Sequence, residues 1–208
     1  MMKGTNMKNR GKKEIRPRRI LQFKISLIDI EPKIWRRFLV PDDIDFERFH
    51  NIIQIIMGWE NYHLFSFENK FCLIDTDKDG FAVDFMWPAL KQRKQTFIAE
   101  TVFLNNIFTT PRQKMIYTYD FGDTWEHEIV LEKILDRDKE QSLPNCLNGE
   151  GNCPPEDCGG VPGYYDFIEI MRNNKHPEHK RMVEWYGEVY NPDYFSLDEV
   201  NAVFVSRN

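Results

Sequence analysis

The chain has 208 residues, of which 41% are hydrophobic and 14% aromatic, and its formal net charge is −5. This length fits one ordinary domain with a sizeable core, and the 16 Phe and 5 Trp exclude a largely disordered protein. No apolar run approaches the roughly 18 residues of a membrane-spanning helix, and no apolar segment of a secretory signal follows the basic start. Four cysteines without such a signal indicate a reducing compartment, so we expect a cytoplasmic protein without membrane contact.

Positive charge is concentrated at the start of the chain. Basic side chains from Lys3 to Arg19 outnumber the single acidic residue, Glu14, by seven, which leaves −12 on the remainder. We expect residues 1–19 to form a disordered basic tail and residues 20–208 to form a single domain. Such a tail is either simply solvated or makes a weak contact with nucleic acid through its phosphates.

The first half of the chain begins with two strands and a helix. Alternating apolar residues predict a half-buried strand over Ile20–Ile28, with an antiparallel neighbour at Ile34–Val40. Apolar residues at helical spacing predict a helix over Phe46–Met57, which Asp45 caps and Gly58 ends.

Further strands are expected beyond this helix. Tyr62–Phe67 reads as a strand with His63 on its apolar face, and Thr101–Phe108 as a short helix capped by Thr101. Between them, Phe85–Thr96 is expected to be a loop. Lys114–Tyr119 and Trp125–Lys133 predict the two strands of a hairpin.

The last third reads as loop and helices. Pro144–Gly163 is rich in Gly, Pro and Cys and predicts a structured loop. Helices are expected over Tyr164–Asn173, Glu178–Gly187 and Leu197–Val205, the last capped by Ser196. We therefore predict an α+β fold, an antiparallel sheet with packed helices that are concentrated in the C-terminal third.

The most chemically loaded stretch is the hairpin segment 120–127, which contains Asp120, Asp123 and His127. Strand alternation places His127 with Trp125 on the core face and Glu126 on the opposite face, so these groups cannot all reach one ion. One interpretation is structural: the two aspartates bind turn amides, Gly122 adopts a left-handed conformation, and the histidine is packed. The other is that the turn forms one wall of a site.

Three histidines lie on apolar faces of different elements. His50, His63 and His127, together with Asp120, would suit Zn²⁺ or Fe²⁺ if the fold brought them together. Nothing in their spacing requires this, because a single histidine on an apolar face is usually a packed one.

A second candidate metal site lies among the cysteines. Cys146, Cys153 and Cys158, with His176 or His179 as a fourth ligand, would complete a structural zinc site. The spacing is loose and lacks a Cys-x2-Cys pair, so the alternative is three small side chains that pack inside an irregular loop.

The loop around Cys158 offers no phosphate-binding motif. Gly159–Gly163 lacks the lysine of a P-loop and does not follow a predicted strand, which disfavours nucleotide hydrolysis. The neighbouring carboxylates Glu156 and Asp157 are expected to cap the helix that starts near Gly163.

Several of these motifs together resemble the plasmid pRiA4b ORF-3-like family. The resemblance implies a compact α+β domain, sometimes encoded on plasmids or beside transposases, and gives no catalytic residues to transfer. A resolvase-like activity is disfavoured because no serine stands among arginines. The matching segments are 34–37 (IWRR), 49–59 (FHNIIQIIMGW), 63–65 (HLF), 117–127 (YTYDFGDTWEH) and 153–160 (CPPEDCGG).

Two functions follow from these observations. The first is a non-catalytic binding or interaction module for an unknown protein or nucleic acid, associated with mobile genetic elements. Its ligand surface would comprise Trp35, Trp59, His63, Asp120, Asp123 and Trp125. The alternative is a metal-dependent hydrolase or nuclease that uses His50, His63, Asp120, Asp123 and His127. No cofactor is expected, with zinc as the one alternative.

Overall fold

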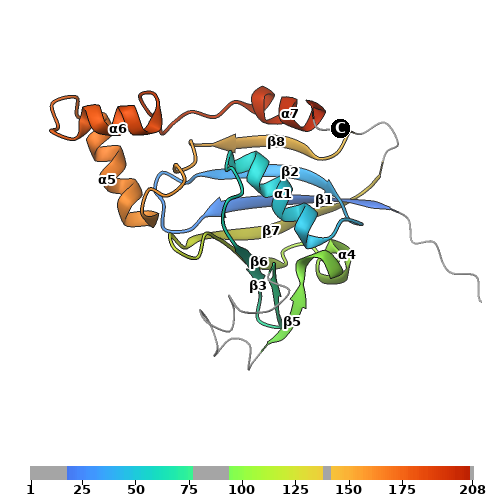
Figure 1. Ribbon diagram of the computed structural model, residues 1–208. Coiled ribbons are helices and arrows are strands. Elements are labelled where there is room, and N and C mark those ends of the chain that lie inside the picture. The colour runs from blue at the N-terminus through green and yellow to red at the C-terminus, as the bar shows by residue number, and fades with distance from the viewer. Residues whose placement is uncertain (1–17, 77–93, 138–141, 207–208) are drawn as a thin grey trace, which may run out of the picture.

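The computed structural model describes residues 18–76, 94–137 and 142–206, whose strands form one eight-stranded sheet (Figure 1). The strand order is β5-β4-β3-β6-β7-β1-β2-β8, and neighbours are antiparallel except for β4 and β5. The α+β class is therefore confirmed. The strands are β1 (Arg19–Leu27), β2 (Trp35–Pro41), β3 (Phe65–Glu68), β4 (Cys72–Asp75), β5 (Gln95–Ile98), β6 (Lys114–Tyr119), β7 (Trp125–Asp136) and β8 (Asn145–Glu150).

Helices occur in both halves of the described chain. They are α1 (Phe46–Met57), α4 (Leu104–Ile107), α5 (Gly160–Arg172), α6 (His179–Tyr186) and α7 (Leu197–Ser206), with a 3-10 turn at Ala99–Thr101. Because α1 precedes six of the strands and α4 precedes three, the helices are not clearly concentrated in the C-terminal third as predicted. Among the described residues, no helix is both long and apolar enough to cross a membrane.

Helix α1 covers one face of the sheet, where it lies across β1 and β2 (Figure 1). The Asp45 side chain accepts a hydrogen bond from the N–H of Arg48 at 2.7 Å, and Gly58 ends the helix with φ 87°. Phe49 packs against Phe23 at 5.0 Å between ring centroids. Both ends of this helix and its packing face are therefore as the apolar spacing predicts.

The hairpin of β6 and β7 brings its turn beside the start of β3. Tyr119 pairs with Trp125 on one side and with Phe65 on the other. Trp125 and His127 are buried and Glu126 is exposed, as alternation predicts. Strand β3 begins at Phe65 rather than Tyr62, so His63 lies in the loop before the strand.

Three local predictions differ from the structure. Residues 145–150 form an edge strand that pairs with β2, whereas the sequence predicts a loop. The strand forms through backbone hydrogen bonds to β2, and the segment lacks the alternating apolar residues by which a strand is recognised in sequence. Helix α5 begins at Gly160, four residues before the predicted start. Helix α4 begins after Phe103, since Thr101 ends the preceding 3-10 turn.

Two other predictions fall wholly or largely outside the described residues. Of the predicted basic tail, residues 1–17 lie outside the described ranges. Of the predicted loop over Phe85–Thr96, residues 85–93 lie outside them. Of the tail, Arg18 pairs with Asp43 at 3.2 Å and Arg19 begins β1. The last two residues of the predicted loop, Gln95 and Thr96, belong to β5.

Candidate metal centre

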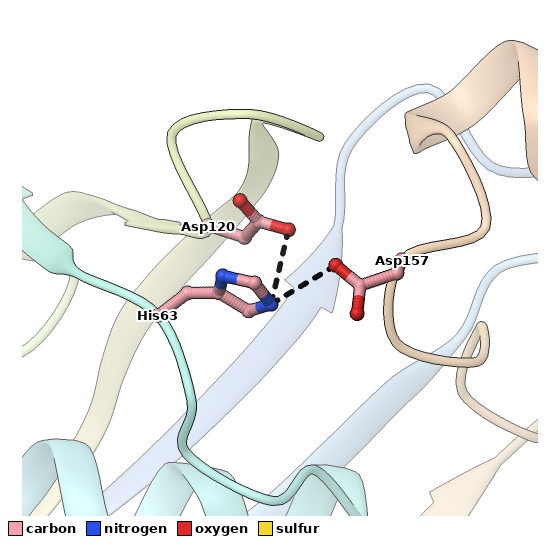
Figure 2. A group of neighbouring side chains, drawn as sticks. All are labelled: His63, Asp120 and Asp157. Atoms are coloured by element: carbon pink, nitrogen blue, oxygen red, sulfur yellow. Dashed lines mark ion pairs between the residues drawn. The ribbon is translucent and has the colours of Figure 1, made fainter.

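Three side chains from distant parts of the sequence converge at one end of the sheet (Figure 2). His63 precedes β3, Asp120 follows β6, and Asp157 lies in the loop before α5. The Nε2 atom of His63 lies 3.6 Å from Oδ2 of Asp120 and 3.2 Å from Oδ1 of Asp157. One ligand atom from each residue lies within 4.8 Å of the other two, which is close enough to hold one metal ion.

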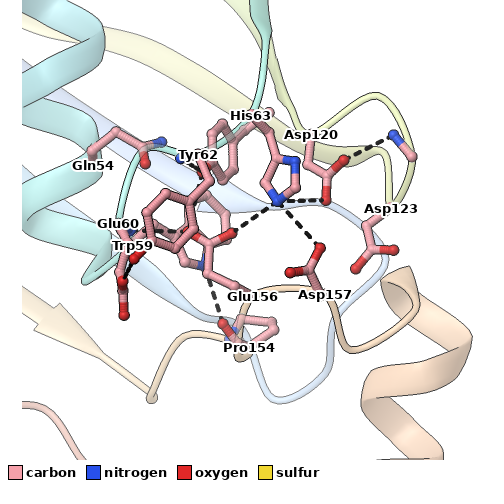
Figure 3. A network of polar contacts seen from close by, with 12 residues as sticks. Gln54, Trp59, Glu60, Tyr62, His63, Asp120, Asp123, Pro154, Glu156 and Asp157 are labelled. Atoms are coloured by element: carbon pink, nitrogen blue, oxygen red, sulfur yellow. Dashed lines mark hydrogen bonds and ion pairs between the residues drawn. The ribbon is translucent and has the colours of Figure 1, made fainter.

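A third carboxylate, that of Glu156, faces the same imidazole (Figure 3). Its Oε2 atom lies 3.7 Å from Nε2 of His63. Its Oε1 atom accepts hydrogen bonds from the N–H of Glu60 at 2.9 Å and from the Tyr119 hydroxyl at 3.1 Å. Glu156 thus presents its second oxygen to the histidine while the first is fixed by the protein.

The turn that carries Asp120 orients its carboxylate in the same way. The backbone N–H of Asp120 donates a hydrogen bond to the carbonyl oxygen of Leu64 at 3.0 Å, which holds the turn next to the residue after His63. Its Oδ1 atom accepts from the N–H of Gly122 at 2.9 Å, so Oδ2 is the oxygen left to face the imidazole. Asp120 and Thr124 adopt positive φ angles of 55° and 57°, whereas Gly122, where the left-handed conformation was expected, does not.

The loop that carries Asp157 is held against this turn. Oδ2 of Asp123 accepts from the N–H of Gly159 at 3.0 Å. A side chain at Gly160 would come within 2.5 Å of the Asp123 carbonyl oxygen, so only glycine allows this approach. Trp59 anchors the loop through a 3.0 Å hydrogen bond from its indole to the carbonyl of Pro154.

The distances around His63 suit metal ligands better than direct hydrogen bonds. Oxygen and nitrogen ligands about 2.1 Å from a tetrahedral ion lie roughly 3.4 Å apart, close to the 3.2–3.7 Å found here. Within the described residues, neither Nε2 of His63 nor Oε2 of Glu156 makes a hydrogen bond, although both atoms are buried. Three carboxylates around one imidazole also favour a cation.

His50 and His127 do not join this group, contrary to the four-residue cluster considered from the sequence. His50 contacts the Tyr117 hydroxyl at 2.8 Å and Oδ1 of Asn61 at 2.6 Å, and His127 contacts the Tyr117 carbonyl at 3.2 Å. Burial lowers the pKa of each histidine to about 4. Both are therefore neutral core residues at pH 7.

The structure does not bring the three candidate zinc cysteines together. No cysteine belongs to a potential metal-binding group in the described ranges. The Cys146 thiol contacts the carbonyl of Arg37 at 3.6 Å, and the Cys153 thiol contacts the sulfur of Met57 at 3.9 Å. Burial, followed by the charge of Asp123, raises the pKa of Cys158 to about 12, so its thiol is protonated at neutral pH.

The tryptophans proposed for a ligand surface occupy different positions. Trp59 and Trp125 are buried, and Trp59 stacks on Tyr119 at 4.9 Å between ring centroids. Neither indole is therefore exposed to a ligand. Trp35 lies on β2, where its indole donates to Glu150 at 2.9 Å.

Glu156 and Asp157 are the site residues that the sequence did not reveal. The helix-capping role expected for them is wrong, because α5 is capped at Gly159 without any side-chain hydrogen bond. Their Pro-Pro-Glu-Asp-Cys-Gly-Gly motif and the hairpin at 120–127 both stand out in the sequence. The signal that could have found them is the pairing of these two motifs, which only the fold supplies.

These features define a class of protein. Its members are α+β domains in which the hairpin that carries two aspartates lies beside a Pro-Pro-Glu-Asp-Cys-Gly-Gly loop, with one histidine between them. The chain belongs to the Plasmid pRiA4b ORF-3-like protein family, whose match covers residues 19–199. The resemblance seen in the sequence is thereby confirmed.

Two proteins are similar to this chain over most of its length. The chain is 33% identical over 171 residues to the "Uncharacterized protein y4hQ" of Sinorhizobium fredii (strain NBRC 101917 / NGR234). The aligned residues cover 81% of each sequence. The chain also resembles the crystal structure of the protein of unknown function MM3350 from Methanosarcina mazei Go1. That match has a TM-score of 0.75 and 32% identity, and it covers 88% of this chain and 97% of the other.

Proposed function

We propose that this protein is a binding module whose ligand is a divalent metal ion, held by His63, Asp120 and Asp157 with Glu156 beside them. One observation carries the proposal. Asp120 and Glu156 each have one oxygen fixed by protein donors and turn the other toward the unbonded Nε2 of His63. Ligands of metal sites are commonly oriented by such outer hydrogen bonds.

The donor set narrows the choice of ion. Imidazole suits zinc and other first-row transition metals, whereas carboxylates suit manganese, magnesium and calcium. One imidazole with two or three carboxylates therefore favours Zn²⁺ or Mn²⁺ over Cu⁺. An ion here would also link three segments that lie far apart in the sequence and relieve the repulsion among their carboxylates.

The experiment is metal titration of the full chain by calorimetry, after removal of bound metal. We expect one equivalent of Zn²⁺ or Mn²⁺ to bind. Asp157→Asn should weaken binding at least tenfold with little effect on folding, because this side chain is 70% exposed. Glu126→Gln, which removes the same charge from an exposed position on β7, is the matched control and should bind normally.

Two results would reject the proposal. One is the absence of stoichiometric binding of either ion to the wild-type chain. The other is equal affinity of the Asp157→Asn variant and the wild-type chain, which would place the ion elsewhere.

A metal-dependent hydrolase or nuclease is the second candidate, and the exposure of Asp157 favours it. Three protein ligands at a solvent-facing position leave room for a further ligand, as in catalytic zinc sites. Hydrolysis of a phosphodiester probe that requires Zn²⁺ or Mn²⁺ and is lost in His63→Ala would establish this function. The family's description refers to a plasmid, and an association with mobile genetic elements is part of the first proposal, the binding module.

A further inference from the structure

A pocket of about 560 Å³ lies between α5 and α6. Its apolar walls are formed by Phe167 and Ile170 of α5 and by Met182 and Trp185 of α6. The volume of the pocket is within the range of small-molecule sites, which is about 300–1,000 Å³. Its size and lining therefore suit a small ligand that carries an aromatic or branched apolar group.

Trp185 gives this pocket an aromatic surface that a ligand can reach. The residue is 50% exposed, and its ring contacts the buried Phe167 edge-to-face at 5.8 Å between ring centroids. An indole attracts cations through the quadrupole of its ring, and it does so more strongly than the rings of tyrosine and phenylalanine. The aromatic wall therefore favours a ligand with a positive charge.

The charged side chains on the wall of the pocket are net negative. Asp157 and Asp166 line it, and the basic residue that lines it, Arg181, already pairs with Glu178. Asp166 forms no hydrogen bond or ion pair with any residue that the structure describes. Its carboxylate is therefore available to a cationic ligand, whereas the wall as a whole opposes an anionic one.

The Cys158 thiol, which also lines the pocket, lies in the same negative surroundings. Burial raises its pKa most, and the carboxylates of Asp123, Asp157 and Glu156 raise it further, to about 12. Negative charge that disfavours a thiolate also disfavours any other anion at this place, and it stabilises a cation. The inner end of the pocket and its aromatic wall thus favour the same kind of ligand.

We propose that the α5–α6 pocket binds a small organic cation, an amine whose ammonium group pairs with Asp166 and Asp157 and whose apolar group packs against Trp185. This inference goes beyond the proposed metal site and does not depend on it, because Asp166 and the apolar walls are separate from the candidate metal ligands. Arylalkylamines such as tryptamine have this chemistry, and they are protonated at neutral pH as lysine is.

Calorimetric titration with tryptamine tests the inference on the full chain after removal of bound metal. Metal is removed because an ion held by Asp157 would offset part of the negative charge of the wall. The matched probes are tryptophol, which has a hydroxyl in place of the amine, and indole-3-propionate, which has a carboxylate. Methylammonium is the probe that lacks the ring. We expect tryptamine to bind at least about tenfold more tightly than each of these compounds.

Two substitutions separate the charge of the pocket from its aromatic wall. Asp166→Asn should weaken tryptamine binding about tenfold, because it removes the unpaired carboxylate. Glu169→Gln is the matched control, since Glu169 is exposed on the same helix as Asp166 and does not line the pocket. Trp185→Leu keeps an apolar side chain but removes the indole, and it should weaken binding about fivefold.

Three results would overturn the inference. The first is the absence of tryptamine binding. The second is an affinity for tryptophol or indole-3-propionate that equals or exceeds the affinity for tryptamine. The third is undiminished binding of tryptamine to the Asp166→Asn variant, which would show that the charge of the wall plays no part. None of these results bears on the metal centre, which is tested by the separate titration with Zn²⁺ or Mn²⁺.

Discussion

The carboxylate of Asp123 accepts a hydrogen bond from the backbone N–H of Gly159 at 3.0 Å, across 36 positions of sequence. This contact joins the β6–β7 turn to the loop before α5. Asp120 lies on the first segment and Asp157 on the second, so the same contact sets the distance between two of the candidate metal ligands. The docking of these segments is therefore expected to control both stability and metal affinity.

Gly160→Ala tests this docking. The new Cβ would lie 2.5 Å from the Asp123 carbonyl oxygen, and neither backbone can move without separating the two segments. Gly187→Ala is the matched control, since Gly187 also has a positive φ but no atom within 4 Å of a new Cβ. We expect Gly160→Ala to lower the free energy of unfolding by about 1–3 kcal/mol more than Gly187→Ala, as measured by denaturant titration. Equal losses would contradict the close approach.

Tyr119→Phe tests the support of Glu156. The substitution removes the hydroxyl that donates to Oε1 of Glu156 at 3.1 Å. Because outer hydrogen bonds commonly change metal affinity by about 10–100-fold, we expect Zn²⁺ or Mn²⁺ to bind roughly tenfold more weakly. Tyr194→Phe, which removes a hydroxyl bonded to Glu199 on α7, is the control and should leave the affinity unchanged. Unchanged affinity in Tyr119→Phe would show that Glu156 plays no part in holding the ion.

Acid should destabilise the metal-free protein through its buried histidines. Burial lowers the pKa of His50 and His127 from 6.5 to about 4, so the unfolded chain binds protons that the folded chain does not. Stability is therefore lost as the pH falls from 6.5 toward 4, by about 2 kcal/mol per histidine between pH 7 and 5. Denaturant titrations at both pH values measure this change. In His127→Gln the loss should be smaller, and an equal loss would show that His127 does not titrate with the expected shift.

Metal binding should raise the thermal stability of the wild-type chain. An ion at 100 times its dissociation constant adds about 2.7 kcal/mol if it binds only the folded state. We expect a higher Tm with Zn²⁺ or Mn²⁺ and a much smaller increase in Asp157→Asn, measured by calorimetry in parallel with Glu126→Gln. A similar increase in both variants would assign the stabilisation to another site.

Local sequence patterns were sufficient for much of the fold. The cap at Asp45, the stop at Gly58 and the alternation in β7 are set by nearby residues, and each is found where it was predicted. Strand β8 was missed because it pairs through its backbone at the edge of β2 and carries few apolar side chains. Patterns of neighbouring residues do not predict backbone pairing between strands that are distant in the sequence.

The candidate site could be predicted only in part. His63 and Asp120 were identified as candidate ligands from their residue types, and the structure places them 3.6 Å apart. Their partner Asp157 comes from a loop 37 positions beyond Asp120, and no periodicity relates it to the hairpin. The sequence also suggests His50 and His127 as candidate ligands because they lie on apolar faces. Residues on apolar faces are buried in the core, and both histidines are therefore away from the site.

The most direct test of the metal centre is a crystal structure of the protein grown with Zn²⁺, with diffraction measured at the zinc absorption edge. We expect one anomalous peak about 2.0–2.2 Å from Nε2 of His63 and from a carboxylate oxygen of both Asp120 and Asp157. A zinc peak elsewhere, such as at the cysteines, with none between these three side chains would contradict it.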